Sequence, residues 1–304
     1  MLFIMPASPI SEFSVPLAIV CHDAGGANQI VAMLDENIVQ RTDLRVYVEG
    51  PAAKVWQHHF PSKRIENTLT SALQGAHILI SGTSWQSDLE HQARQLAQQQ
   101  RIYSVALLDH WVNYRERFMR IDKTVLPDQL WVTDEHAERL ARLKIPELSL
   151  RRVHDFYMQH QLTQIQGTTS PTVPEILFLC EPAMSNWGKS IPGEFQALDF
   201  FIACLPDLPI PQQAGIILRP HPSESTEKYL SWAQGKNAQR ISIDTSVELG
   251  NAIGRAKWVV GCQSYAMTVA IRANRSVYCA LPPWATPCVL PHPEIIRLKD
   301  LYKS

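Results

Sequence analysis

The sequence predicts an α/β protein with two doubly wound, Rossmann-like domains that face a cleft, as in a GT-B-like fold. Short apolar segments alternate with amphipathic segments along the whole chain, which is typical of strand–helix units in a parallel sheet. Most apolar segments are continuous, as expected for strands that helices cover on both faces. The chain has 304 residues, more than one hydrophobic core usually holds, so we expect two domains.

The first half of the chain alternates predicted strands with predicted helices. Several strands end in polar residues, at the carboxyl edge where open parallel sheets bind ligands. We therefore expect the tips His22/Asp23, Glu49, Thr83/Ser84 and Asp109/His110 to converge. The predicted strands are residues 16–21, 44–50, 76–84, 102–111 and 129–137, and the helical patterns are QIVAMLDENIVQ, LEHQARQLAQQQ and EHAERLARL.

The second half repeats this architecture after a polar segment, residues 159–174, whose Thr, Ser and Pro content predicts a linker. We place the domains at residues 1–165 and 166–304. PEIIRLKDLYKS, at the end of the chain, has the spacing of a helix. The predicted strands are residues 175–180, 216–218, 241–246, 257–264 and 276–283, and helices are predicted between them from EFQALDFFIACL, VELGNAIGRA and YAMTVAIRAN.

Charge and cysteine content limit the function classes. Lys and Arg total 28 and Asp and Glu total 29, a balance that gives no support to a nucleic-acid partner. The six cysteines form no CxxC pair, so we expect buried thiols in a reducing compartment and no metal site. The apolar N-terminus lacks the basic start of a signal peptide, and no segment is long enough for a membrane helix. We expect a cytoplasmic protein and leave peripheral association with the inner membrane open.

The first motif, HDAGGAN, lies between the first strand and a helix. Strand, glycine-rich turn and helix place amide groups where they can bind an anion, and Gly25 and Gly26 allow a tight turn or close approach of a ligand. The motif is not GxGxxG and has no P-loop lysine, which argues against NAD and ATP of the Walker type. In one interpretation Asp23, or His22, acts as a general base. In the other, Asp23 caps the helix and His22 only packs against its neighbours.

Residues 112–120, VNYRERFMR, interleave Tyr114 and Phe118 with arginines. The segment either holds an anionic acceptor or forms a solvated face with aromatic anchors. We favour the solvated face.

The second motif, GIILRPHPSE, runs from Gly215 to Glu224. Its two prolines end an apolar strand and stiffen the turn, and Ser223 is placed to cap the next helix. Arg219 and His221 suit an anionic ligand such as a nucleotide phosphate. The alternative is that both side chains stabilise carbonyl groups at the strand end.

RPHPSE, a strand ending in Asp-Thr-Ser, and VVGCQSYAMTVAIRANRSVYCALPP together resemble the C-terminal half of GT-B glycosyltransferases. They are most similar to the bacterial sialyltransferase-like and polysialyltransferase-like group, whose HP and serine motifs bind the donor nucleotide. Capsule polymerases that use CDP-linked donors have a related pattern. The first half of the chain matches these enzymes in architecture only.

The resemblance implies a set of donor-binding residues. His221 would contact the donor phosphate and stabilise the leaving nucleotide, and Pro222 would shape its turn. Ser264 would bind phosphate through its hydroxyl and the helix N-terminus. Gln263 stands where the serine motif often has a second serine. Glu181 and the loop after it would border the nucleotide base.

The resemblance also implies a general base near the N-terminus, in an Asp/Glu-Asp/Glu-Gly motif. The nearest counterpart is His22-Asp23-Ala24-Gly25, which departs from that motif, so Asp23 has His22 and Asp109 as alternatives. Base catalysis would activate an acceptor hydroxyl, and Arg219 would help stabilise the departing phosphate. The chain has no DxD triplet, which agrees with transfer that needs no metal and no cofactor.

The leading hypothesis is a metal-independent glycosyltransferase. It would move a sugar from a CMP- or other NDP-linked donor to a surface glycan or lipid-linked acceptor, with residues 1–165 on the acceptor side and residues 166–304 binding the donor nucleotide. A non-hydrolysing sugar-nucleotide epimerase and a non-catalytic nucleotide-sugar binding protein are the alternatives. The sequence does not identify the base, sugar or acceptor, because variable loops form these pockets.

Overall fold

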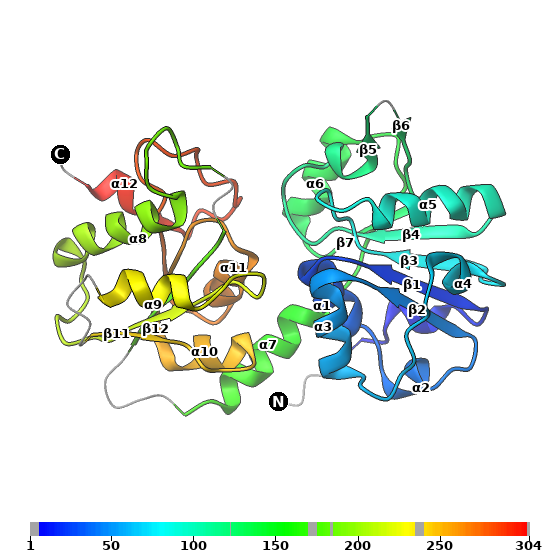
Figure 1. The fold of residues 1–304 in the computed structure, drawn as a ribbon, viewed down its shortest axis with the longest axis horizontal. Helices are drawn as coiled ribbons and strands as arrows, with labels where there is room; N and C mark the ends of the chain where they lie inside the picture. The colour runs from blue at the N-terminus through cyan, green and yellow to red at the C-terminus, as the bar shows by residue number, and fades with distance from the viewer. Residues whose placement is uncertain (1–5, 122, 170–174, 183–184, 235–239, 303–304) are drawn as a thin grey trace. The chain divides into compact units, whose positions relative to one another are not determined.

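The structure, a computed structural model, describes residues 6–121, 123–169, 175–182, 185–234 and 240–302 (Figure 1). The chain divides into a first unit, Met1–Tyr157, and a second unit, Met158–Ser304. The division falls in the first turn of α7 (Phe156–Gly167). This helix covers the first part of the segment that we predicted as a linker, and residues 170–174 of that segment lie outside the described residues.

The first unit is built around a six-stranded parallel sheet in the order β2-β1-β3-β4-β7-β8. The predicted strands are all present. β1 begins one residue later than predicted, and the other four end earlier because their polar tips belong to the following loops. β8 is an additional edge strand. The bounds are β1 Leu17–Cys21, β2 Leu44–Val48, β3 Ile78–Ser81, β4 Tyr103–Leu107, β7 Gln129–Val132 and β8 Leu150–Arg152.

Helices cover both faces of this sheet, because successive β1 side chains point to opposite sides. Leu17 and Ile19 belong to one core cluster, with residues of α1 and α3, and Ala18 and Val20 to another, with residues of α4 and α5. The predicted helix over QIVAMLDENIVQ is two helices, since Asp35 caps a new one through the amide of Ile38. The helices are α1 Ala24–Ala32, α2 Glu36–Val39, α3 Gly50–His59, α4 Leu69–Leu73, α5 Leu89–Gln100 and α6 Glu135–Lys144.

Short elements complete the first unit. Arg120 connects a two-stranded antiparallel ribbon to the loop after β3, donating to the carbonyls of Ser84 and Ser87. These elements are η1 Pro9–Glu12, η2 Glu116–Phe118, β5 Met119–Arg120 and β6 Lys123–Thr124.

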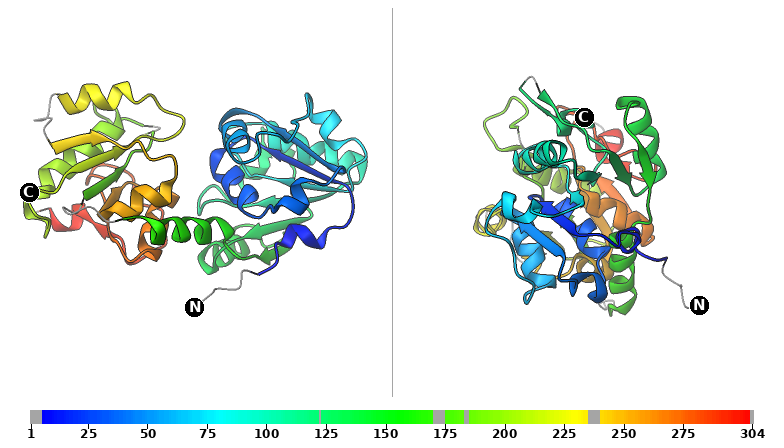
Figure 2. Two further views of the ribbon diagram at one scale, coloured as in Figure 1. Left: turned by 90° about the horizontal axis from the view of Figure 1, so that it is seen from below. Right: turned by 90° about the vertical axis from the view of Figure 1, so that its right-hand side faces the viewer.

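The second unit contains another six-stranded parallel sheet, in the order β11-β10-β9-β12-β13-β14. This is the strand order of the Rossmann fold, and its switch point lies between β9 and β12. Figure 2 shows helices on both sides of the sheet in each unit. The bounds are β9 Glu175–Leu179, β10 Ile216–Arg219, β11 Ile241–Ile243, β12 Ala256–Gly261, β13 Ser276–Cys279 and β14 Ile296–Arg297.

The helices of the second unit confirm most predictions and correct two. Ser264 caps α11, with its hydroxyl accepting from the amide of Ala266 at 3.2 Å. Ser223 does not cap the next helix, which begins only at Glu227. The predicted C-terminal helix is instead β14 and one helical turn, since this segment pairs with β13. The elements are α8 Gly193–Cys204, η3 Leu205–Asp207, α9 Glu227–Gln234, α10 Leu249–Arg255, α11 Tyr265–Arg272 and α12 Leu298–Leu301.

All six cysteines are free thiols, as predicted, and all except Cys288 are buried. Within the described part of the chain, every helix is too short or too polar to cross a membrane.

Candidate functional site

The carboxyl edge of the first sheet gathers the predicted polar tips. β2, β1, β3 and β4 are successive neighbours in the sheet, so the residues that follow these strands lie along one edge. The chain reverses its winding direction between β1 and β3. Crevices at such switch points are where open α/β sheets bind ligands.

His22 and Asp23 form a pair immediately after β1. His22 Nδ1 lies 3.0 Å from Asp23 Oδ1, and both side chains are partly exposed. Asp23 occupies the N-cap position of α1, but its side chain makes no capping hydrogen bond. Capping therefore does not explain this carboxylate. The pair is an imidazole oriented by a carboxylate, an arrangement that can accept a proton from a hydroxyl group.

Gly25 and Gly26 serve close packing within the first unit. A Cβ at Gly25 would lie 2.2 Å from Asp109 Oδ2, and one at Gly26 would lie 3.2 Å from the Cα of Gly82. Neither is among the glycines with positive φ. The two glycines therefore let α1 approach the tips of β3 and β4 directly.

Asp109 is held by Arg117, a residue that we had placed on a solvated face. Arg117 Nη1 donates to Asp109 Oδ1 at 2.8 Å and to the carbonyl of Thr83 at 2.9 Å, and Nε donates to the carbonyl of Val112 at 2.9 Å. The Arg117 side chain is only 4% exposed. The prediction of a solvated face is wrong for this arginine, because the β4 tip supplies a carboxylate beneath it.

The aromatic anchors in the same segment are confirmed. Tyr114 and Phe118 are buried. Arg115, by contrast, pairs with Glu147 at the surface. The segment therefore has one buried arginine between two buried rings.

Two buried charged residues of α5, Glu90 and Arg94, support this edge through backbone groups. Glu90 Oε1 accepts from the amide of His22 at 2.8 Å, and burial raises the pKa of Glu90. Arg94 donates to the carbonyls of Gly82, Val125 and Arg117, and burial lowers its pKa to about 10. Neither residue was predicted from the sequence, because charges on an amphipathic helix normally face solvent.

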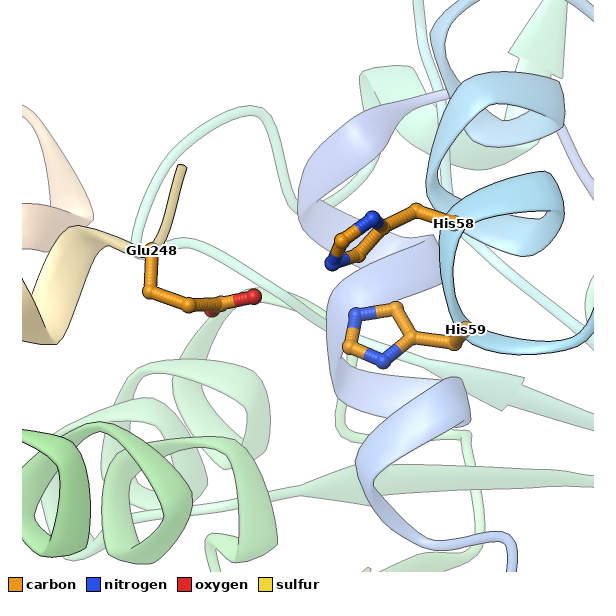
Figure 3. Close-up of side chains that lie close together, drawn as sticks. All are labelled: His58, His59 and Glu248. Carbon is orange, nitrogen blue, oxygen red and sulfur yellow. The ribbon is translucent and has the colours of Figure 1, made fainter. Parts of the chain in front are cut away.

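His58 and His59 end α3, with their ring centroids 4.9 Å apart in an edge-to-face arrangement (Figure 3). Glu248, also labelled in Figure 3, belongs to the second unit, where it precedes α10.

In the second unit, Glu181 follows β9 and contacts the start of α11. Its Oε1 accepts hydrogen bonds from the backbone amides of Cys262, Gln263 and Ser264, at 2.9, 2.8 and 2.9 Å. Because β9 and β12 are the strands at the switch point, these contacts join the two sides of the expected crevice. The structure thus brings three predicted residues together, in a contact that the sequence did not predict.

Arg219 ends β10 and His221 follows the strand, and the two side chains contact different partners. Arg219 pairs with the buried carboxylate of Asp244 and donates to the carbonyls of Ser246 and Val247 at 2.9 and 3.1 Å. These contacts match the alternative in which Arg219 stabilises the strand end. His221 Nδ1 lies 2.7 Å from the hydroxyl of Ser223 and accepts from the Ser223 amide at 3.2 Å. This contact with His221 explains why Ser223 does not cap a helix.

Pro222 lies in that turn and is exposed. The turn therefore presents His221 and Pro222 at the carboxyl edge of β10. Because Nδ1 accepts an amide hydrogen bond, the proton of the neutral imidazole lies on Nε2.

The loop after β9 is held by Gln196 of α8. Gln196 Nε2 donates to the carbonyls of Asn186 and Ile191, and its Oε1 accepts from Trp284 Nε1 at 2.6 Å. Lys189 lies over the Trp284 ring, 3.5 Å from its centroid. Trp284 was not predicted from the sequence; it follows β13 and presents a half-exposed ring beside this loop.

The sequence matches no protein-family model and none of the curated proteins. Solved structures are similar to it in fold. A protein assigned as a UDP-N-acetylglucosamine 2-epimerase from Listeria monocytogenes has a TM-score of 0.60 at 10% identity, over 88% of this chain and 79% of that chain. The UDP-GlcNAc 2-epimerase from Neisseria meningitidis, bound to UDP-GlcNAc, has a TM-score of 0.58 at 8% identity, over 86% and 82%. The glycotransferase of kitacinnamycin has a TM-score of 0.51 at 13% identity, over 95% and 87%.

The chain has a GT-B-like fold of two Rossmann-like domains. This likeness covers both units, and the strand order of each sheet agrees with it. At such low identity the likeness is one of fold, so function has to be argued from the residues at the two carboxyl edges.

Proposed function

We propose that the chain is a glycosyltransferase that moves a sugar from a nucleotide-sugar donor, CMP- or other NDP-linked, to a surface glycan or lipid-linked acceptor without a metal ion. The observation that carries the proposal is the His22–Asp23 pair at the switch point of the first sheet. An acceptor hydroxyl needs a base to take its proton, and this pair has the residue types and the position for that role.

The first unit supplies the base in this proposal. Asp23 orients the imidazole through Nδ1, so that His22 Nε2 takes the proton of the acceptor hydroxyl. Asp109, fixed by Arg117, lies beside the start of α1 and is the alternative base. Glu90 is a positioning residue, because it binds the backbone amide of His22.

The second unit binds the donor in this proposal. His221 Nε2–H donates to a phosphate oxygen and stabilises the leaving nucleotide, while Pro222 shapes the turn. The amides of residues 262–264 and the Ser264 hydroxyl form the other phosphate contact. The finer proposal is that the chain belongs to the sialyltransferase-like group with the HP motif. A lipid-linked acceptor would require peripheral association with the inner membrane.

A sugar-nucleotide 2-epimerase is the second candidate. Two structures with TM-scores of 0.60 and 0.58 are assigned this activity, and one of them is bound to UDP-GlcNAc. An epimerase would use similar phosphate contacts. It would also need acid and base groups around the sugar, for which His22, Asp23 and Asp109 are available.

The test begins with a thermal-shift screen against CMP, CDP, UDP, GDP, ADP and NAD, because a ligand of the folded state raises the melting temperature. Sugar conjugates of the nucleotides that bind are then incubated with and without glycan acceptors. Sugar transfer that requires an acceptor supports the transferase, whereas a new sugar epimer without acceptor supports the epimerase. Saturable binding without turnover of any donor would favour a non-catalytic binding protein and contradict both.

Variants test the roles in the first unit. We expect Asp23→Asn and His22→Gln to lower kcat on the order of 10²–10⁴-fold, the usual contribution of a general base. Asp43→Asn is the matched control, because Asp43 pairs with Arg41 before β2, at the opposite edge of the same sheet. Full activity of both site variants would exclude this pair as the base.

A further inference from the structure

Glu181 occupies a position that favours an anion. Amides from three successive residues, 262–264, donate to one of its oxygens, at the N-terminus of an eight-residue helix. Converging amides and a helix N-terminus together form a binding site for phosphate groups and carboxylates. In this chain the anion is a side chain from the strand across the switch point.

The surroundings of Glu181 do not neutralise its charge with a cation. Among the described residues, no lysine, arginine or histidine forms an ion pair with it, and the amides alone hold it. It interacts electrostatically with the Glu224 carboxylate, which pairs with Lys228, and with three thiols in loops that follow β9, β12 and β13. The thiols are Cys180, Cys262 and Cys288.

Burial raises the pKa of Glu181 to about 7, against three amide hydrogen bonds that lower it, and the Glu224 carboxylate raises it further. Burial also raises the pKa of the Cys180 and Cys262 thiols, which stay neutral. A hydrogen bond with Cys279 lowers the pKa of Cys288 to about 7. Two groups near the crevice therefore change charge close to neutral pH.

We propose that the Glu181 carboxylate occupies a phosphate-binding site, the amides at the N-terminus of α11. A ligand phosphate binds these amides only when it displaces the carboxylate. The inference rests on the proposed function, since it takes the ligand to be a nucleotide bound at the switch point of the second unit. Glu181 is thus a specificity-determining residue: the ionised carboxylate competes with the phosphate for the same amides and repels it. The neutral carboxyl group accepts weaker hydrogen bonds from the amides and does not repel the phosphate.

This competition predicts how nucleotide affinity depends on pH. Only chains with neutral Glu181 bind well, so the apparent Kd equals the intrinsic Kd divided by the neutral fraction. With a pKa of about 7, affinity falls about 25-fold between pH 6.5 and pH 8.5. The terminal phosphate of CMP, CDP or UDP gains charge over this range, which by itself would strengthen binding to a cationic site. The predicted direction is therefore the opposite of ordinary phosphate binding.

The experiment is calorimetric titration of the full chain with CMP, CDP, UDP and UDP-GlcNAc at pH 6.5 and pH 8.5. We expect Glu181→Gln to bind about 30-fold tighter than wild type at pH 8.5 and to lose the pH dependence. Glu175→Gln is the matched control, at the amino end of the same strand. Cys288→Ser removes the second titrating group, and we expect it to keep the wild-type pH dependence.

The outcomes separate the inference from the function on which it rests. Equal affinity and equal pH dependence in wild type and Glu181→Gln would overturn the role of Glu181 and leave nucleotide binding intact. Loss of the pH dependence in Cys288→Ser would also overturn it. If no nucleotide binds either wild type or Glu181→Gln, the proposed function fails and the inference fails with it. Circular dichroism and melting temperatures of all variants exclude a folding defect as the cause.

Discussion

Replacing Arg117 by Met would test whether the Asp109–Arg117 pair is a structural centre of the first unit. Methionine keeps most of the apolar stem but removes the charge and every donor. The guanidinium donates to the carboxylate of Asp109, to the carbonyl and hydroxyl of Thr83 and to the carbonyl of Val112. All of these acceptors would lose a partner.

The expected cost follows from burial. Arg117 and Asp109 are 4% and 16% exposed at their side chains. Removing one partner of a buried ion pair typically costs about 3–5 kcal/mol, and we take about 3 kcal/mol because water can still reach Asp109. In a domain of this size, this loss lowers the melting temperature by roughly 6–12 °C. Arg115→Met is the matched control, since its pair with Glu147 is 47% and 42% exposed and is worth about 0–1 kcal/mol.

Thermal unfolding followed by circular dichroism gives the melting temperatures, and hydrogen exchange by mass spectrometry locates the weakened region. Loss of protection should concentrate in the first unit. Adding Asp109→Asn to Arg117→Met should recover part of the stability, because the double variant no longer has an unpaired carboxylate at position 109. If Arg117→Met and Arg115→Met melt at the same temperature, the buried pair does not stabilise the unit and the reasoning is refuted.

Three further predictions concern other parts of the chain. Gly25→Ala should lower the melting temperature, because its methyl group would clash with the Asp109 carboxylate. Gly167→Ala is the control and should leave the melting temperature unchanged, because the space around Gly167 is open. Equal melting temperatures of the two variants would contradict the close packing at Gly25. Burial and nearby arginines lower the pKa of His91 from 6.5 to about 4. Because the unfolded chain then binds protons more readily, the free energy of unfolding should fall as the pH drops from 6.5 towards 4. Urea titrations should show a smaller decrease in the free energy of unfolding for His91→Gln than for wild type. Arg219→Ala should destabilise the second unit by about 2–4 kcal/mol, since it removes a partner from a buried carboxylate and from two carbonyls, and a melting temperature equal to wild type would argue against that structural role.

The strands and most helices could be predicted because their signals are local. Continuous apolar segments such as residues 17–21 and 176–179 pair their backbone groups and bury their side chains in a sheet covered on both faces. Polar residues that follow such segments must lie at one edge, which is why the tips in the first unit could be expected to converge. The C-terminal segment was predicted as one helix because its spacing fits a helix. The edge of β13 makes residues 296–297 a strand, and only the turn at residues 298–301 is helical.

The chemistry of the edges could not be predicted in the same way, because it depends on which strands are neighbours. Arg117 is an ordinary surface arginine by its sequence, and it becomes buried because Asp109 and Thr83 come to lie beneath it. Glu181 and the amides of residues 262–264 are far apart along the chain and meet only because β9 and β12 flank the switch point. A resemblance of motifs places a phosphate on those amides, whereas the structure places a carboxylate there. The competition that we propose between the two anions depends on this strand order, so residue types alone could not predict it.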